Sequence, residues 1–370
     1  MPSLVPTALA RRLNPRKPWR AITMNRLVWL CPLALGSLML VSCGQETAPT
    51  EASSTGAEPL AAPSFAVAGG TWTTKAPMPT PRFHLAAGVQ NNSLGQPVLY
   101  AMGGFDPNVG IVRTVEAYNF ATNTWTTKAP LRLRLWNTNG VGNIGGKLYL
   151  SGGFWEAADG RSGFHPGLHV YDPVRNTWTQ RADMPQRTAG GVTGVINGKL
   201  YVLAGTCNNC GPQRVTRRFY RYDPATNIWT SLPWSPNAHG QGAGGVINGK
   251  FYVAGGSAGN KLDVYDPATN RWRTLAPMPT ARNGVAGGVL QNKLYIVGRS
   301  NAEPGERQNE VEAYNPATNT WESHTPMPGV GRGDLAGASV TYQGRSHFIA
   351  VGGTDVEGSG PGDANQVFTP

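Results

Sequence analysis

Six cationic side chains recur along the chain, each shortly before a run of small residues. They are Arg82, Arg134, Arg187, His239, Arg282 and Arg332. A guanidinium group matches a carboxylate in a bidentate fork, and like charges gathered at one mouth attract anions. If the elements that carry them converge, these residues form a ligand-binding ring for an anion. The alternative is a set of solvated strand-end residues, because the register is imperfect: His239 and Arg282 lie 13 residues before the next tyrosine, Arg187 lies 14 and Arg134 lies 15.

The two cysteines in the body of the chain, Cys207 and Cys210, stand in a loop rich in Gly and Asn. In an oxidising compartment so close a pair predicts a disulfide. A redox-active dithiol is the alternative, but such thiols are activated at a helix start, and here the pair lies between strands. A zinc site would need two further ligands nearby, and the neighbouring sequence offers none.

The remaining polar residues give weaker signals. His165 and His169 are close in sequence, and we interpret them as surface residues rather than metal ligands. The loop carboxylates are interpreted as turn formers, namely Asp106, Glu156, Asp159, Asp334 and Asp355. We therefore predict no metal and no cofactor, and we assign no catalytic residue.

A repeat of about fifty residues positions these side chains. Its clearest copy has an apolar run from Phe251 to Ala254 that stops at Gly255-Gly256, a second run ending at Tyr265, and an Asp-Pro turn before Trp272. A tyrosine and a tryptophan seven residues apart flank the turn in five copies: Tyr118/Trp125, Tyr171/Trp178, Tyr222/Trp229, Tyr265/Trp272 and Tyr314/Trp321. Short strands between turn signals at such a period predict an all-β propeller.

These features resemble the kelch repeat, an apolar strand ending in Gly-Gly, then a Tyr-Asp-Pro turn and a Trp. The resemblance covers about residues 65–370, although the third copy has Ala204-Gly205 and the fifth Gly298-Arg299. It implies a six-bladed propeller. In this family, arginines at the same strand start serve adaptors that bind acidic peptides, and kelch sialic-acid mutarotases handle a carboxylate. Copper-radical oxidases need a Cys cross-linked to a Tyr, which two cysteines in one loop do not favour.

The two ends of the repeat region predict how the ring closes. The segment around Trp72 has the sequence of an outer strand without preceding partners, whereas the last copy ends at Phe368 before its outer strand. We therefore expect the strand at Trp72 to complete the C-terminal blade. Closure of this kind removes exposed sheet edges.

Residues 1–42 have the order of a signal peptide, with six basic residues before an apolar run from Leu27 to Val41. That run is short for a membrane-spanning helix, which needs about 20 residues. The sequence Leu40-Val41-Ser42-Cys43 resembles a bacterial lipobox, which implies that Cys43 carries a lipid. Met24 is a second candidate start. Residues 43–66, rich in Thr, Ser, Ala, Pro and Glu, predict a disordered tether, and residues 67–370 the propeller.

The net charge of the chain limits which binding partners are expected. The chain has a net charge of +11, but six of its 32 basic residues and none of its 21 acidic residues lie in the leader, so the mature charge is +5. No basic run is interleaved with aromatic residues, which disfavours nucleic acid. We expect an exported, monomeric, lipid-anchored protein of the cell envelope that binds an anionic carbohydrate or an acidic peptide. The alternatives are a sugar mutarotase or epimerase and a structural surface protein that binds proteins by its loops.

Overall fold

The computed structural model describes residues 68–370 except 211–213, 299–308, 330 and 356–361. The predicted leader, Cys43 and most of the predicted tether lie outside the described residues. Residues 61–370 form one compact unit, and its described part is built almost entirely of strands. Among the described residues no helix is long and apolar enough to span a bilayer.

The described strands form six four-stranded antiparallel sheets, which we call blades 1 to 6 in chain order. Blade 1 has β2 (Ala86–Asn91), β3 (Pro97–Met102), β6 (Val115–Asn119) and β7 (Thr124–Thr127); blade 2 has β9 (Val141–Ile144), β10 (Lys147–Ser151), β13 (Leu168–Asp172) and β14 (Thr177–Arg181); blade 3 has β15 (Val192–Ile196), β16 (Lys199–Leu203), β17 (Phe219–Asp223) and β18 (Ile228–Leu232). Blade 4 has β19 (Ala243–Ile247), β20 (Lys250–Ala254), β21 (Leu262–Asp266) and β22 (Arg271–Thr274); blade 5 has β23 (Ala286–Leu290), β24 (Lys293–Val297), β25 (Val311–Asn315) and β26 (Thr320–His324); blade 6 has β28 (Ala336–Tyr342), β29 (Arg345–Val351), β31 (Asn365–Thr369) and β1 (Thr71–Thr74).

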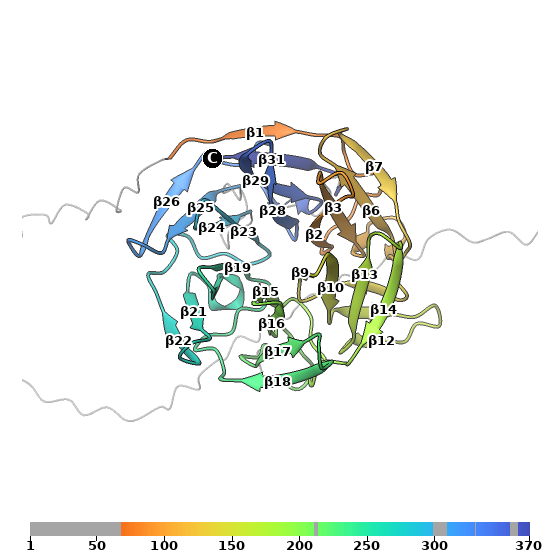
Figure 1. Ribbon diagram of the computed structural model, residues 1–370, viewed down its shortest axis with the longest axis horizontal. Coiled ribbons are helices and arrows are strands. Elements are labelled where there is room, and N and C mark those ends of the chain that lie inside the picture. Colours follow the sequence, from red (N-terminus) through yellow and green to blue (C-terminus); the bar gives the residue numbers. More distant parts are fainter. Residues whose placement is uncertain (1–67, 211–213, 299–308, 330, 356–361) are drawn as a thin grey trace, which may run out of the picture. The chain divides into compact units, whose positions relative to one another are not determined.

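The blades stand around a central axis, and the first strands of neighbouring blades contact one another in a closed cycle (Figure 1). Blade 6 is completed by the N-terminal strand β1, which pairs with β31 in the register Trp72 opposite Phe368. The two rings pack with their centroids 5.2 Å apart. The predicted pairing of the chain's two ends is therefore confirmed.

The repeated tyrosine and tryptophan have separate partners that tie blades together. In each of the five copies the two residues face each other across the third and fourth strands, as Tyr118 does Trp125. The Tyr118 hydroxyl donates to Asn123 Oδ1 at 2.8 Å, and the Trp125 indole donates to the carbonyl of Ala76, which precedes blade 1, at 2.8 Å. Asn123 sits at a positive φ of 54°, which Asn tolerates better than most residues. The seven-residue spacing thus stabilises both a turn and an inter-blade contact.

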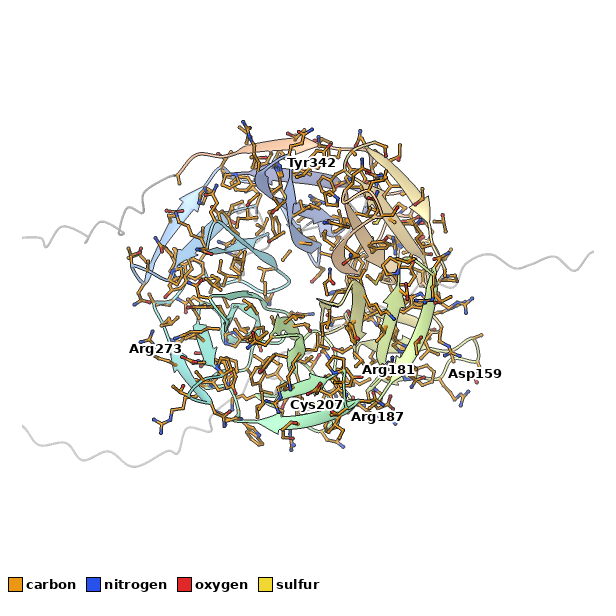
Figure 2. All side chains as sticks on the ribbon, in the orientation of Figure 1. Asp159, Arg181, Arg187, Cys207, Arg273 and Tyr342 are labelled. Carbon is orange, nitrogen blue, oxygen red and sulfur yellow. A yellow bond between two sulfur atoms is a disulfide. The ribbon has the colours of Figure 1, made fainter. Side chains whose placement is uncertain are left out.

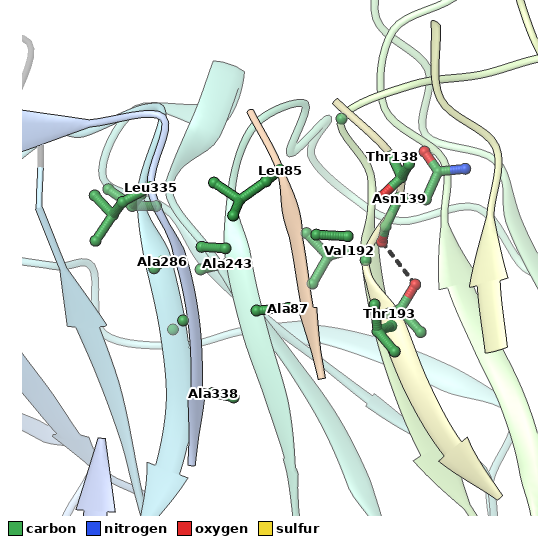
Figure 3. A pocket seen from close by; sticks show the side chains of 18 of the residues that line it. Leu85, Ala87, Thr138, Asn139, Val192, Thr193, Ala243, Ala286, Leu335 and Ala338 are labelled. Atoms are coloured by element: carbon green, nitrogen blue, oxygen red, sulfur yellow. Dashed lines mark hydrogen bonds between the residues drawn. The ribbon is translucent and has the colours of Figure 1, made fainter. Parts of the chain in front are cut away.

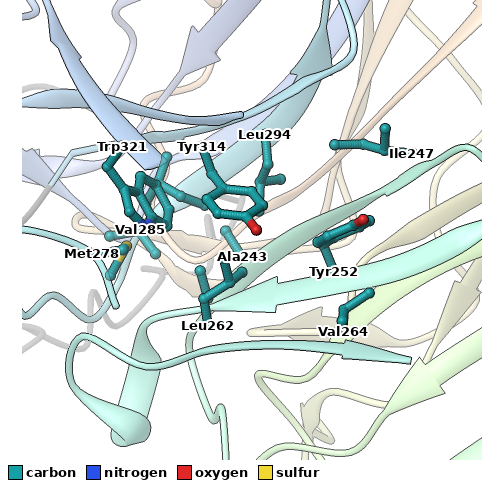
Figure 4. Packing of buried hydrophobic residues seen from close by; sticks show 12 residues of the cluster. Ala243, Ile247, Tyr252, Leu262, Val264, Met278, Val285, Leu294, Tyr314 and Trp321 are labelled. Carbon is teal, nitrogen blue, oxygen red and sulfur yellow. The ribbon is translucent and has the colours of Figure 1, made fainter. Parts of the chain in front are cut away.

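Apolar side chains fill the wedge between each pair of blades. Between blades 4 and 5, Tyr252, Leu262 and Val264 pack against Leu294, Tyr314 and Trp321 (Figure 4). Near the axis the wedge is too narrow for this, and the first strands carry Gly and Ala. A Cβ added to Gly287 would lie 2.8 Å from Ala243 Cβ in the neighbouring blade, which is too close. The close approach of neighbouring first strands therefore accounts for their small residues.

The two ends of the blades differ in the length of the connections that they carry. The turn face carries only short turns, between first and second and between third and fourth strands. The loop face carries the blade-to-blade connections and the longer loops between second and third strands. Short extra elements decorate it: β4 (Phe105–Asp106) with β5 (Gly110–Ile111), β8 (Arg134–Trp136) with β11 (Phe154–Glu156) and β12 (Ser162–Phe164), β27 (Arg332–Gly333) with β30 (Thr354–Asp355), and the 3-10 turn η1 (Gly256–Ala258).

Candidate functional site

Four of the six cationic residues singled out from the sequence are buried inside their blades. Arg82 is fully buried: its Nη1 donates to the carbonyls of Gly103 and Thr114 at 2.7 and 2.9 Å, and its Nη2 to Glu116 Oε2 at 2.7 Å. The same arrangement recurs for His239 with Asp263 and the Gly255 carbonyl, Arg282 with Glu312 and the Gly298 carbonyl, and Arg332 with Gln366 and the Gly352 carbonyl. These side chains join the loop before the first strand to the second and third strands.

Burial and neighbouring partners shift the pKa values of these buried groups in opposite directions. Burial lowers the pKa of Arg82, while the neighbouring Glu116 carboxylate raises it. Burial lowers the pKa of Arg332 to about 10, against the opposing effect of Asp363. For Asp263 burial raises the pKa, but hydrogen bonds from His239, Thr274 and Asn237 outweigh it and hold the pKa below its ordinary value. Each of the four buried side chains is therefore already bonded to partners inside the propeller.

The other two cationic residues, Arg134 and Arg187, are exposed. The residues equivalent to Arg82 in blades 2 and 3 are Leu135 and Thr188, one position later in each case. In each blade a residue with positive φ stands two positions after this one: His84, Asn137, Gly190, Gln241, Gly284 and Asp334. The six residues thus divide into four with buried partners and two open to solvent. Anion binding by the six residues stays a prediction. Among them, Arg134 and Arg187 are the side chains that a dissolved ligand can reach.

The six residues with positive φ form a closed hydrogen-bonded ring at the loop-face end of the axis. Each donates its backbone N–H to the carbonyl of its counterpart in the preceding blade, from His84 to Asp334 at 2.7 Å round to Asn137 donating to His84 at 2.8 Å. The other four distances are between 2.7 and 3.0 Å. Every blade is therefore joined to both neighbours by main-chain bonds that are independent of side-chain identity.

Behind this ring lies an axial cavity of about 310 Å³, lined by the first strands of all six blades. Figure 3 shows its wall of Ala87, Ala243, Ala286 and Ala338, with the Thr193 hydroxyl donating to the Asn139 carbonyl at 2.6 Å. Apart from the mouth, the walls are mainly small apolar side chains and backbone, with Thr193 and Ser339 as hydroxyl groups on the strands. They offer a ligand few distinguishing polar side chains.

A second cavity, of about 540 Å³, lies on the loop face between blades 2 and 3. One wall is the β11–β12 hairpin, which supplies Trp155 and Phe164. The opposite wall is the loop closed by the disulfide between Cys207 and Cys210, which supplies Asn208 and Asn209. Arg187 lines the same cavity, and Figure 2 shows it beside Cys207 at the edge of the molecule. We call this the hairpin cavity.

The disulfide shapes one side of the hairpin cavity. The Gln186 side-chain nitrogen lies 3.0 Å from Cys207 Sγ and 3.1 Å from Cys210 Sγ, and its Oε1 accepts from the Tyr220 hydroxyl at 3.3 Å. These contacts on both sides hold the Gln186 side chain in place. They therefore also restrain the backbone from which the adjacent Arg187 side chain extends. The two asparagines between the cysteines are both exposed, so their amides are open to a ligand.

The hairpin cavity therefore combines three kinds of group. Trp155 and Phe164 are partly buried aromatic rings, Asn208 and Asn209 carry amides that donate and accept, and Arg187 carries a positive charge. Aromatic faces bind apolar surfaces, amides match hydroxyl groups, and a guanidinium group matches a carboxylate. The sequence reasoning found Arg187 but missed the rings and amides. The length of the loops between second and third strands in blades 2 and 3 was the available signal.

The histidine pair lies close to the base of this hairpin. His165 Nε2 and His169 Nε2 are 2.9 Å apart, and the rings stack with centroids 5.1 Å apart. Burial lowers the pKa of His165, and burial together with the charge of His165 lowers the pKa of His169 to about 4. Within the described part of the chain, no cluster of three or more His, Cys, Asp or Glu side chains is arranged to hold a metal ion.

Comparison with protein families matches most of the described chain to one domain type. The model of the KLHDC2/KLHL20/DRC7 Kelch-repeats domain matches residues 143–353, more than half of the chain, and the Kelch motif matches residues 96–132. Kelch-like protein terF of Aspergillus terreus is 31% identical over 180 residues, which cover 44% of this chain and 38% of that protein. Kelch-like protein 26 of Danio rerio is 29% identical over 160 residues, covering 43% and 25%.

The chain thus spans between a quarter and two fifths of the length of these two relatives. A solved structure titled "Structure of YjhT" superposes on it with a TM-score of 0.64 and 19% sequence identity, covering 78% of this chain and 95% of that one. At this identity the likeness concerns the fold alone.

Proposed function

Because this chain belongs to the kelch-repeat β-propeller family, we propose that it is a binding module and that its ligand is an anionic carbohydrate held in the hairpin cavity. One observation carries the proposal: aromatic rings, amides and an exposed guanidinium group line the same cavity of about 540 Å³. An acidic sugar has an apolar ring face, hydroxyl groups and a carboxylate, and each of these finds a counterpart there.

The cavity favours a sugar over an acidic peptide. Two of its side chains, Trp155 and Phe164, are aromatic, and a single arginine supplies the charge. An acidic peptide would leave the two rings without a flat partner. The experiment must therefore distinguish binding of an acidic sugar from binding of an acidic peptide.

The experiment is a titration of galacturonate, galactose and an oligoglutamate peptide into the propeller. We expect galacturonate to bind, galactose to bind more weakly, and Arg187→Ala to lower galacturonate affinity roughly tenfold to a hundredfold, as for a lost charge-assisted hydrogen bond. Trp155→Ala should weaken both sugars. Arg273→Ala, an exposed arginine on β22 of blade 4 that does not line the cavity, is the matched control and should change nothing. Undiminished binding by the Arg187→Ala protein would overturn the proposal.

We further propose that Cys43 carries the lipid anchor and that the module is displayed in the cell envelope. The described chain enters the propeller at the turn face, because β1 starts opposite Thr369, the end of β31. The loop face with the hairpin cavity is the opposite end of the blades. Replacing Cys43 by Ala should move the protein from the membrane fraction to the soluble fraction; retention in the membrane fraction would contradict the anchor.

A mutarotase or epimerase is the second candidate, favoured by one observation at the axial mouth. His84 Nδ1 lies 3.5 Å from Asp334 Oδ1, and both residues stand at positive φ in the main-chain ring. Such a pair could move a proton to and from a sugar. Proton-exchange NMR of acidic sugars tests it: His84→Asn and Asp334→Asn keep residues that tolerate positive φ, and an exchange rate equal to that of buffer in the unmodified protein would exclude the activity.

A further inference from the structure

A cluster of two arginines and a tryptophan lies on the loop face next to the hairpin cavity. Trp234, in the connection from blade 3 to blade 4, is 56% exposed. The guanidinium carbons of Arg217 and Arg218 lie 5.9 and 5.2 Å from the centre of its ring, within the range of a cation–π interaction. Among the described residues Trp234 is the one large aromatic side chain that is mostly exposed.

The positive charges of this cluster are not neutralised within the described residues. No ion pair there engages Arg217 or Arg218, and the one side-chain bond of Arg217 is from its Nη1 to the carbonyl of Pro236 at 3.2 Å. Elsewhere in the described chain arginines beside an aspartate pair with it, as Arg161 does with Asp159. The Trp234 ring thus holds two guanidinium groups whose remaining N–H donors face solvent.

The cluster is connected to the hairpin cavity through two side chains. Arg218 lies within electrostatic reach of Tyr220, whose hydroxyl donates to Gln186 Oε1 at 3.3 Å. Gln186 lines the hairpin cavity beside Arg187. Arg187 and the pair Arg217 and Arg218 thus lie on the loop face of blade 3, with Trp155 in the same cavity as Arg187 and Trp234 beside the pair.

We propose that this series binds an acidic oligosaccharide: one sugar unit occupies the hairpin cavity, and the chain continues over Trp234 so that later carboxylates meet Arg218 and Arg217. This deepens the function proposed above and rests on it. In this arrangement a single sugar unit fills the hairpin cavity, whose lining does not include Arg217 or Arg218, so the cluster contributes to the binding of the longer ligand alone. The exposed part of the Trp234 ring suits a sugar face, and an acidic peptide offers no such face.

The experiment compares galacturonate with its linear hexamer on the whole chain and on three variants. We expect the hexamer to bind the unmodified protein at least tenfold more tightly than the monomer, and to lose that advantage in the Arg217→Ala/Arg218→Ala protein. Monomer affinity should be unchanged in that variant. Trp234→Ala should lower hexamer affinity severalfold, and Arg273→Ala should leave both affinities unchanged.

The outcomes separate the two proposals. If the double variant binds the hexamer as the unmodified protein does, the extended site is refuted while the hairpin cavity stands. If neither monomer nor hexamer binds, the function proposed for the cavity fails as well. If a hexaglutamate peptide binds with the same dependence on Arg217 and Arg218, the ligand is an acidic peptide and the carbohydrate assignment is overturned. All substituted side chains are exposed, so an unchanged melting temperature shows that each variant is folded.

Discussion

Blades 1 and 5 differ from blades 2 and 3 at one pair of equivalent positions. In blades 1 and 5 a buried arginine meets a buried glutamate, Arg82 with Glu116 and Arg282 with Glu312. In blade 2 the same two positions hold Leu135 and His169, and in blade 3 they hold Thr188 and Tyr220. Of these four blades, the two without the ion pair are those that carry the hairpin cavity.

The difference shows what the ion pair does. Arg82 holds together the loop before β2, the end of β3 and the strand β6, all through one guanidinium group. Blades 2 and 3 lack these bonds, and the residue at the position of Glu116 contacts a loop residue instead. His169 contacts His165 at the base of the hairpin, and Tyr220 contacts Gln186 behind the disulfide. Loss of the pair in blades 2 and 3 accompanies side chains that support a site.

The largest expected effect comes from breaking the ion pair in blade 1. Glu116→Ala leaves the Arg82 charge buried without its carboxylate, and removing one partner of a buried pair costs about 3–5 kcal/mol. The unfolding free energy from urea denaturation should fall by that amount. Arg134→Ala, the exposed arginine of blade 2, should change it by less than about 0.5 kcal/mol.

A double variant sharpens the same comparison. Replacing Arg82 by Leu and Glu116 by His gives blade 1 the two side chains of blade 2. Because a buried pair often contributes little net stability, this protein should be more stable than Glu116→Ala alone. If it is equally or more unstable, the two blades are not interchangeable at these positions and the comparison does not hold.

The histidine pair gives blade 2 a pH dependence that blade 1 lacks. The folded pKa of His169 is about 4, against an ordinary value of 6.5, because burial and the neighbouring His165 disfavour its charge. The unfolded chain therefore binds the proton more readily, so its contribution to stability is complete above pH 6.5 and is lost as the pH falls towards 4. The loss should be roughly 2–3 kcal/mol in denaturation curves.

A variant isolates this effect. His169→Gln places at this position the residue that blade 6 has as Gln366, which removes the titrating group. Its stability should vary less between pH 7 and pH 4 than that of the unmodified protein. An unchanged pH profile would show that other groups cause the acid sensitivity.

The sequence predicted the fold because the repeated contacts use fixed spacings. The tyrosine and tryptophan of each copy are seven residues apart since they face each other across one tight turn, and the pairing of Trp72 with Phe368 follows from the same pattern. The cationic positions have no such constraint. Arg134 and Arg187 stand one residue before the positions equivalent to Arg82, and the positive φ that marks the register at Asn137 and Gly190 cannot be seen in a residue pattern.

The site was harder to predict than the blades for a related reason. Trp155 and Asn208 meet across two loops that belong to different repeats, so no spacing within one copy brings them together. Arg187 was found only because it falls near a repeated position, and its place in the hairpin cavity depends on the neighbouring hairpin and disulfide. Loop length marks where such a site can form, but the partners depend on how two blades sit side by side.

The smallest expected effect tests the main-chain ring, which blades with and without the ion pair share. Gly190 has a φ of 63°, donates to Asn137 and accepts from Gln241, and a Cβ there would lie 2.9 Å from Asn137 Oδ1. Gly190→Ala should cost roughly 1–2 kcal/mol for the left-handed backbone, plus the displacement of Asn137. Gly95→Ala, with a φ of 74° in an open turn of blade 1, should incur the backbone cost alone. Equal losses in the two variants, measured by urea denaturation, would show that the ring tolerates a side chain at Gly190 and is not a close-packed contact.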